Sequence, residues 1–120
     1  MTDAAATPAA TIEDFARLDI RAGTIVDAQP LAGARKPAYR LEVDFGPVLG
    51  IRRSSAQLVT LYEPASLVGR QVIAVVNFPP RRVAGFSSEV LVLGLRDAGD
   101  AGAIVLVEPE RPVCDGARLA

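Results

Sequence analysis

The side chains best suited to bind a ligand lie close together, in the segment of residues 77–89. Two adjacent guanidinium groups, on Arg81 and Arg82, can each bind a phosphate or a carboxylate through paired hydrogen bonds. Two phenyl rings, Phe78 and Phe86, offer surfaces on which a base or an apolar side chain can stack. The segment therefore predicts a binding surface rather than a reactive one. The same residues also fit an alternative in which both rings close the end of a barrel and both guanidiniums face solvent.

The residue types that catalysis requires are scarce in this sequence. There is no histidine and one cysteine, Cys114, so a Ser-His-Asp triad, a Cys-His pair and a zinc or iron site all lack members. Carboxylates such as Glu42 and Asp44 alternate on the polar face of an expected strand, which is typical of solvation. We therefore expect no catalysis, no metal and no cofactor. The lone thiol indicates a reducing compartment, and no signal-peptide or membrane-spanning run is present, which predicts a soluble cytoplasmic protein without membrane insertion.

Charge is distributed unevenly along the chain. The 13 Lys and Arg and the 14 Asp and Glu give a net charge of −1. Residues 1–34 and 83–120 each sum to −3, whereas residues 35–82, with eight basic and three acidic residues, sum to +5. If these charges gather in space, they produce a local positive field that attracts a polyanion. If they are scattered over the surface, they are only solvated, and the sequence leaves both arrangements open.

Two apolar runs, residues 71–76 and 90–93, flank the ligand-binding segment and are short enough to be strands. The segment is therefore expected to be a hairpin connection. Pro79 and Pro80 fix φ and remove two backbone donors, so the first of these strands must end before them. Gly85 permits the return turn. Because both runs are nearly continuous in apolar residues, they are predicted to be buried on both faces.

The rest of the chain predicts further short strands. Strict alternation marks residues 39–45 as a half-buried strand, and Gly23 is expected at a bend or bulge of the first strand. The other expected elements are a helix over 11–18 capped by Thr11, strands over 19–28, 49–55 and 103–107, helical character over 56–62, a loop over 64–69 and an extended tail over 109–120. This order predicts an all-β fold, an OB-type Greek-key barrel of five to six strands with a short N-terminal helix and a short helix between strands 3 and 4.

The chain length bounds the domain organisation. We expect residues 1–10 to form a disordered tail and residues 11–120 to form a single domain. Half of the 120 residues are hydrophobic, which is a high fraction for so small a domain. Part of the apolar surface is therefore expected to be buried between subunits.

Three motifs carry a resemblance to a known family. They are residues 18–25 (LDIRAGTI), 77–86 (NFPPRRVAGF) and 88–94 (SEVLVLG). From about Ile12 to the end of the given chain, the sequence resembles the tRNA-binding OB-fold family found beside some aminoacyl-tRNA synthetases. Residues 54–57 (SSAQ) and the double proline resemble the CsaA branch of that family, which comprises export-related, chaperone-like proteins.

The resemblance implies partners and site residues. It implies a homodimer of OB barrels, with N- and C-terminal segments in the interface, and it implies tRNA as a partner. The CsaA branch implies binding of unfolded precursor polypeptides before export. The residues that match the family's loop are Asn77, Arg81, Arg82, Ser88 and Glu89, and Arg52 matches its basic strand position, so the resemblance implies these six as ligand-binding residues. For a bound polypeptide we expect apolar contacts from Tyr39, Phe78 and Phe86.

The sequence departs from the synthetase-associated members at three places. Pro79 stands where they usually carry a lysine, Ala56-Gln57 where they carry Ser-Gly, and Val90-Leu91 where they carry Gly-Met. This chain therefore lacks a cation and a hydroxyl that the synthetase-associated members carry on this surface. The fold is unaffected. We accordingly expect a CsaA-like chaperone that binds unfolded precursor polypeptides as a homodimer. The alternative is a structure-specific, non-catalytic tRNA-binding protein.

Overall fold

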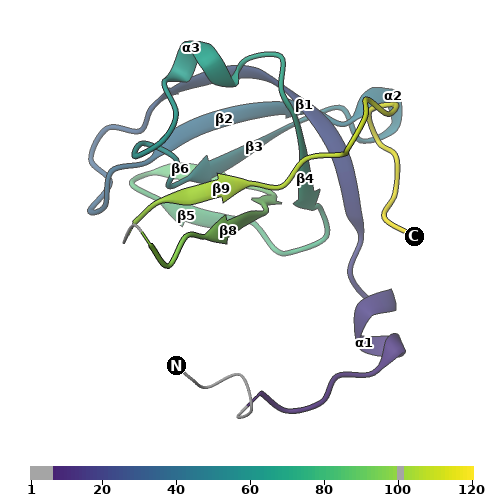
Figure 1. Ribbon diagram of the computed structural model, residues 1–120. Helices are drawn as coiled ribbons and strands as arrows, with labels where there is room; N and C mark the ends of the chain where they lie inside the picture. Colours follow the sequence, from purple (N-terminus) through teal and green to yellow (C-terminus); the bar gives the residue numbers. More distant parts are fainter. Residues whose placement is uncertain (1–6, 100–101) are drawn as a thin grey trace.

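The fold is a five-stranded antiparallel sheet that curls into a barrel (Figure 1). The computed structural model describes residues 7–99 and 102–120. The strand order is β3-β2-β1-β4-β7. These strands are β1 Ile20–Pro30, β2 Tyr39–Asp44, β3 Ile51–Ala56, β4 Gln71–Val75 and β7 Leu91–Val92. Of the predicted tail over residues 1–10, residues 1–6 lie outside the described residues, and residues 7–10 are exposed and outside any helix or strand.

The barrel closes where β3 meets the chain that leads into β7. The carbonyl of Arg53 accepts hydrogen bonds from the backbone N–H groups of Glu89, at 2.7 Å, and of Val90, at 3.3 Å. Two residues further along β3, the backbone N–H of Ser55 donates to the hydroxyl of Ser88 at 3.0 Å. The first and last strands of the sheet are thus joined, which confirms the predicted OB-type barrel.

Alternation along the strands fills the barrel with aliphatic side chains. In β2 the odd-numbered residues are buried and the even-numbered residues are exposed or half-buried, as the sequence predicts. The largest fully buried side chains of the described residues are Ile25, Leu41, Val43, Phe45, Leu67, Val72 and Ser54. A Cβ on Gly23 would lie 2.7 Å from Val43 and from the ring of Phe45, so a glycine is required there for close packing. The bulge in β1 falls between Ile25 and Asp27, so the prediction of a bulge at Gly23 was wrong.

Two short hairpins are added to the barrel. The segment between β4 and β7 folds into β5 Arg81–Val83 and β6 Phe86–Ser88. Their two-residue turn has positive φ at both Ala84 (51°) and Gly85 (80°), the geometry that suits the twist of a tight hairpin. The second hairpin pairs β8 Gly94–Arg96 with β9 Ile104–Leu106, in agreement with the expected last strand.

The three helices within residues 7–99 and 102–120 are short. α1 Ile12–Ala16 begins with the predicted Thr11 cap, and Figure 1 shows it beside the barrel rather than packed on it. α2 is Gly46–Leu49. The helix between β3 and β4 is present, but α3 spans Pro64–Leu67 and not residues 56–62, so its predicted position was wrong. Proline suits the first turn of a helix because the backbone N–H that it lacks would have no intrahelical partner there, and the buried Leu67 anchors this turn to the core.

The C-terminal segment is part of the barrel, so the prediction of a trailing tail was wrong. The N–H of Ala22 donates to the carbonyl of Ala117 at 2.9 Å, and the N–H of Gly116 donates to the carbonyl of Ala22 at 2.8 Å. The hydroxyl of Thr24 donates to Asp115 at 2.6 Å. The segment therefore covers the part of β1 that β2 leaves unpaired.

An ion-pair cluster reinforces this attachment. The carboxylate of Asp19 accepts from Nε of Arg21 at 2.7 Å and lies 3.7 Å from Nε of Arg118 in the C-terminal segment. The hydrogen bond from Arg21 lowers the pKa of the Asp19 carboxyl below its ordinary value, and the charges of Arg21 and Arg118 act in the same direction.

Candidate ligand groove

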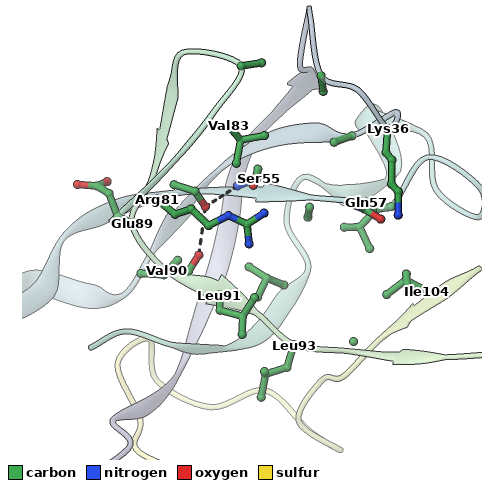
Figure 2. Close-up of a pocket in the computed structure, with 18 of the residues that line it drawn as sticks. Lys36, Ser55, Gln57, Arg81, Val83, Glu89, Val90, Leu91, Leu93 and Ile104 are labelled. Carbon is green, nitrogen blue, oxygen red and sulfur yellow. Dashed lines mark hydrogen bonds between the residues drawn. The ribbon is translucent and has the colours of Figure 1, made fainter. Parts of the chain in front are cut away.

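An open groove of about 1410 Å³ lies between the barrel and its two added hairpins (Figure 2). Its walls are the loop after β1 (residues 33–38), the β5–β6 hairpin, the chain from Ser88 through β7, and the β8–β9 hairpin. Small-molecule pockets usually measure about 300–1,000 Å³, so this groove exceeds what a metabolite needs. Its size suits a segment of a polymer.

The floor of the groove is apolar. Aliphatic side chains of β7, of the residues on either side of it and of β9 line it, and they are Val90, Leu91, Leu93, Ile104 and Leu106. Leu91 is 46% exposed, so the prediction that residues 90–93 are buried on both faces was wrong. The run is continuous in apolar residues because one face meets the core and the other meets the groove. Exposed aliphatic surface of this kind marks a site that something else covers.

The rim of the groove is basic. Five cationic side chains from three separate segments line it, and they are Arg35, Lys36, Arg81, Arg82 and Arg96. Among the described residues the lining holds one acidic side chain, Glu89, whose carboxylate lies 3.8 Å from Nε of Arg53 and accepts from the backbone N–H of Arg53 at 2.9 Å. Among residues 7–99 and 102–120, no carboxylate forms an ion pair with any of the five cations. A protein with a net charge of −1 thus carries a concentrated positive field at this groove.

Five of the nine residues predicted to contact ligands line the groove: Phe78, Arg81, Arg82, Ser88 and Glu89. Only some of them are free to meet a ligand. The hydroxyl of Ser88 is bonded to β3 and to the carbonyl of Val90, as the dashed lines in Figure 2 show. Glu89 is held by Arg53. Arg81 and Arg82 are exposed, and Arg82 donates to the carbonyl of Gly85 at 3.1 Å.

Asn77 and Arg52 lie outside the groove and bond to backbone groups. The amide oxygen of Asn77 accepts from the N–H of Asp19 at 2.9 Å, and its nitrogen donates to the carbonyl of Arg17 at 2.8 Å. Asn77 thereby holds the end of α1 to the start of β1. Nε of Arg52 donates to the carbonyl of Leu49 at 3.0 Å. A ligand contact by either residue stays a prediction.

Two aromatic residues predicted to bind polypeptide also lie elsewhere. Tyr39 is buried in the core, and its hydroxyl donates to the carbonyl of Tyr62 at 2.7 Å. Phe86 packs beneath the guanidinium of Arg53, whose Cζ lies 5.3 Å from the ring centroid. It borders a separate cavity of about 120 Å³ on the outer face of β2 and β3. Phe78, which is 43% exposed, is the aromatic residue of the three that reaches the groove.

Sequence reasoning missed three of the rim cations. Arg35 and Lys36 fall in the basic segment of residues 35–82 and Arg96 falls in the acidic segment of residues 83–120, and none of the three belongs to a motif that predicts a ligand contact. The topology offers a signal for the first two, since an OB barrel brings the loop after its first strand beside the loop between its last two strands. Arg96 offered no such signal, because the β8–β9 hairpin is an addition to the five-stranded barrel.

Within the described residues, no cluster of three or more Cys, Asp or Glu side chains could hold a metal ion. No helix in that part of the chain is long and apolar enough to cross a membrane.

Comparisons with known proteins match the whole barrel. Residues 20–118 match the family model described as "Putative tRNA binding domain". The chain is 36% identical over 107 residues to a methionine–tRNA ligase of Porphyromonas gingivalis, covering 89% of this chain and 15% of the ligase. It thus spans about a sixth of the curated relatives' length, and the match covers one domain of those enzymes.

Two solved structures match over their full lengths. A chaperone CsaA from Bacillus anthracis is 50% identical with a TM-score of 0.86, covering 94% of this chain and 100% of that one. A CsaA chaperone protein from Picrophilus torridus is 40% identical with a TM-score of 0.85, covering 93% and 100%. The chain therefore belongs to the tRNA binding domain family and is of the CsaA type within it.

Proposed function

We propose that this chain is a CsaA-like chaperone that holds unfolded precursor polypeptides before export and catalyses no reaction. The observation that carries the proposal is the apolar floor of the groove, which is open to solvent and larger than a metabolite requires. An extended polypeptide can lay aliphatic side chains on Leu91, Leu93 and Ile104. The similarity to two CsaA chaperones over their full lengths supports the same function.

Holding by this groove should be of modest affinity. A client loses conformational freedom when it is held, and this entropy loss offsets much of the apolar contact. Burying the exposed half of one leucine contributes about 1 kcal/mol, or about fivefold in Kd. Modest affinity suits a chaperone, because the client must be released for export.

The test is an aggregation assay with one groove variant and one matched control. A chemically denatured, aggregation-prone polypeptide is diluted into buffer containing the protein, and light scattering is followed. The wild-type protein should suppress scattering, and Leu91→Ser should need about five times more protein for the same effect. Val48→Ser is the control, because Val48 is 90% exposed on α2 and does not line the groove. Equal scattering with and without the wild-type protein would exclude the chaperone function.

A second candidate function, tRNA binding, is favoured by the five cations of the rim. Cationic side chains that converge from separate segments can contact successive phosphates of a folded RNA. The positions that depart from the synthetase-associated members all line this groove, and they are Ala56, Gln57, Pro79, Val90 and Leu91. Arg35, Lys36 and Arg96 supply positive charge beside them. The test is the salt dependence of tRNA binding, which Arg81→Ala/Arg82→Ala should reduce.

We further propose that the protein works as a cytoplasmic homodimer. Two apolar side chains of α1 are exposed, Ile12 at 72% and Phe15 at 41%, and α1 buries no side chain against its own barrel. A second subunit would cover this surface. Light scattering that gives a monomer mass at micromolar concentration would contradict the dimer.

A further inference from the structure

The apolar floor and the basic rim of the groove lie directly beside each other. In the β8–β9 hairpin, Arg96 pairs directly with Ile104, and both side chains line the groove. Directly paired residues of antiparallel strands have Cβ atoms about 5 Å apart. A chain that covers Ile104 therefore also covers the base of the Arg96 side chain.

A cation also lies beside the apolar floor at the other end of the groove. Arg81 pairs with Ser88, whose hydroxyl is bonded to the carbonyl of Val90 in the floor. Figure 2 shows the guanidinium of Arg81 and the side chain of Leu91 in the same part of the cavity, with Lys36 on another side. The cations thus surround the floor on several sides, so a ligand on the floor lies within reach of most of them.

We infer that tRNA and unfolded polypeptide occupy this groove one at a time, so that tRNA regulates polypeptide holding. The inference rests on both candidate functions proposed above. A polypeptide on the floor blocks the phosphate path along Arg81 and Arg96, and an RNA backbone on those cations covers the leucines. The smaller cavity at Phe86 suits either ligand less well than the groove, since it measures about 120 Å³ and is lined by Asp27 and Glu42 as well as by arginines.

The experiment is a competition followed by fluorescence anisotropy on the full chain. The probe is a labelled synthetic peptide of aliphatic and neutral polar residues, so that displacement reports steric exclusion rather than attraction between peptide and RNA. Unlabelled tRNA is the competitor, and the Kd of each ligand alone is measured first. With tRNA at ten times its own Kd, simple competition raises the apparent Kd of the peptide about elevenfold.

Two variants make the competition specific to the groove. In Arg81→Ala/Arg82→Ala, the tRNA concentration that displaces half of the peptide should rise by the same factor as the Kd for tRNA. In Arg111→Ala it should be unchanged, because Arg111 does not line the groove and its guanidinium pairs with Glu110 at 2.7 Å.

Each outcome decides the inference. Displacement that follows the tRNA Kd in all three proteins supports one shared groove. Peptide anisotropy that stays high while tRNA is bound shows a ternary complex and overturns the inference while leaving both functions standing. Failure of either ligand to bind alone overturns the corresponding function, and with it the inference, and the separate Kd measurements identify which function has failed.

Discussion

Removing Arg81 and Arg82 should weaken tRNA binding in a way that depends on salt. Each phosphate that a cation neutralises contributes about −0.7 to the slope of log K against log salt for single-stranded RNA and about −0.9 for a duplex. Five rim cations therefore predict a slope between about −3.5 and −4.5. The double variant, with three cations left, should give a slope between about −2.1 and −2.7.

The corresponding affinities are measurable in one titration series. Raising salt from about 50 to about 200 mM should weaken wild-type binding by at least about 100-fold, and binding by the Arg81→Ala/Arg82→Ala variant by about 20- to 40-fold. Anisotropy of labelled tRNA at four or five salt concentrations gives both slopes. Arg111→Ala is the matched control, since it removes one exposed arginine outside the groove and should keep the wild-type slope.

An unchanged slope in the double variant would refute the assignment of the rim as the phosphate path. Binding at low salt with normal slope would then require cations elsewhere on the molecule. Flat anisotropy of the wild-type protein at tens of micromolar would refute tRNA binding altogether, and polypeptide holding would remain as the function of the groove.

Three further predictions concern the fold that positions the groove. Gly23→Ala brings a Cβ to 2.7 Å from two core side chains and should lower the free energy of unfolding by about 1–3 kcal/mol in urea, whereas Gly99→Ala, whose Cβ would lie 3.4 Å from its nearest neighbour, should change it by less than about 0.5 kcal/mol. Because the pKa of Asp19 is lowered on folding, its stabilisation is complete above its unfolded pKa of about 3.9 and is lost as pH falls through the folded value, so the stability difference between wild type and Asp19→Asn should shrink in acid. Asn77→Ala should speed amide hydrogen exchange in α1 by about tenfold, and Asn77→Asp, which keeps the acceptor but loses the donor to Arg17, should fall between that variant and wild type.

The barrel could be predicted from the sequence because its signals are local. Alternation over residues 39–45 specifies the buried face of β2, and the Gly46-Pro47 pair ends the strand where α2 begins. The paired prolines and Gly85 mark a connection between two strands, and that connection is a hairpin. In each case the side chains or backbone restrictions that decide the structure lie within a few residues of one another.

The features that escaped prediction depend on distant contacts. The C-terminal segment reads as a tail because its prolines and Gly116 break local patterns, yet it pairs with β1 through Ala22, nearly 100 residues away in the chain. The helix after β3 lies at Pro64–Leu67 because Leu67 is buried there, while Ala56, expected within the helix, is held in β3 by pairing with Tyr39. The basic rim is likewise assembled from segments that meet only in the folded barrel.

The motif that carries the family resemblance serves two separate purposes in this structure. Its polar residues Asn77, Ser88 and Glu89 direct their side chains to backbone groups of the barrel or of α1, so they close and brace the fold. Arg81 and Arg82 lie on the hairpin between them, with exposed side chains on the groove. Replacing a member of the first set leaves a barrel N–H unsatisfied, which costs about 1–3 kcal/mol where the group is buried and disturbs binding only indirectly. Loss of ligand binding in a Ser88 or Glu89 variant is therefore informative about the groove only when its unfolding curve matches that of the wild type, whereas the exposed arginine pair can be tested without that ambiguity.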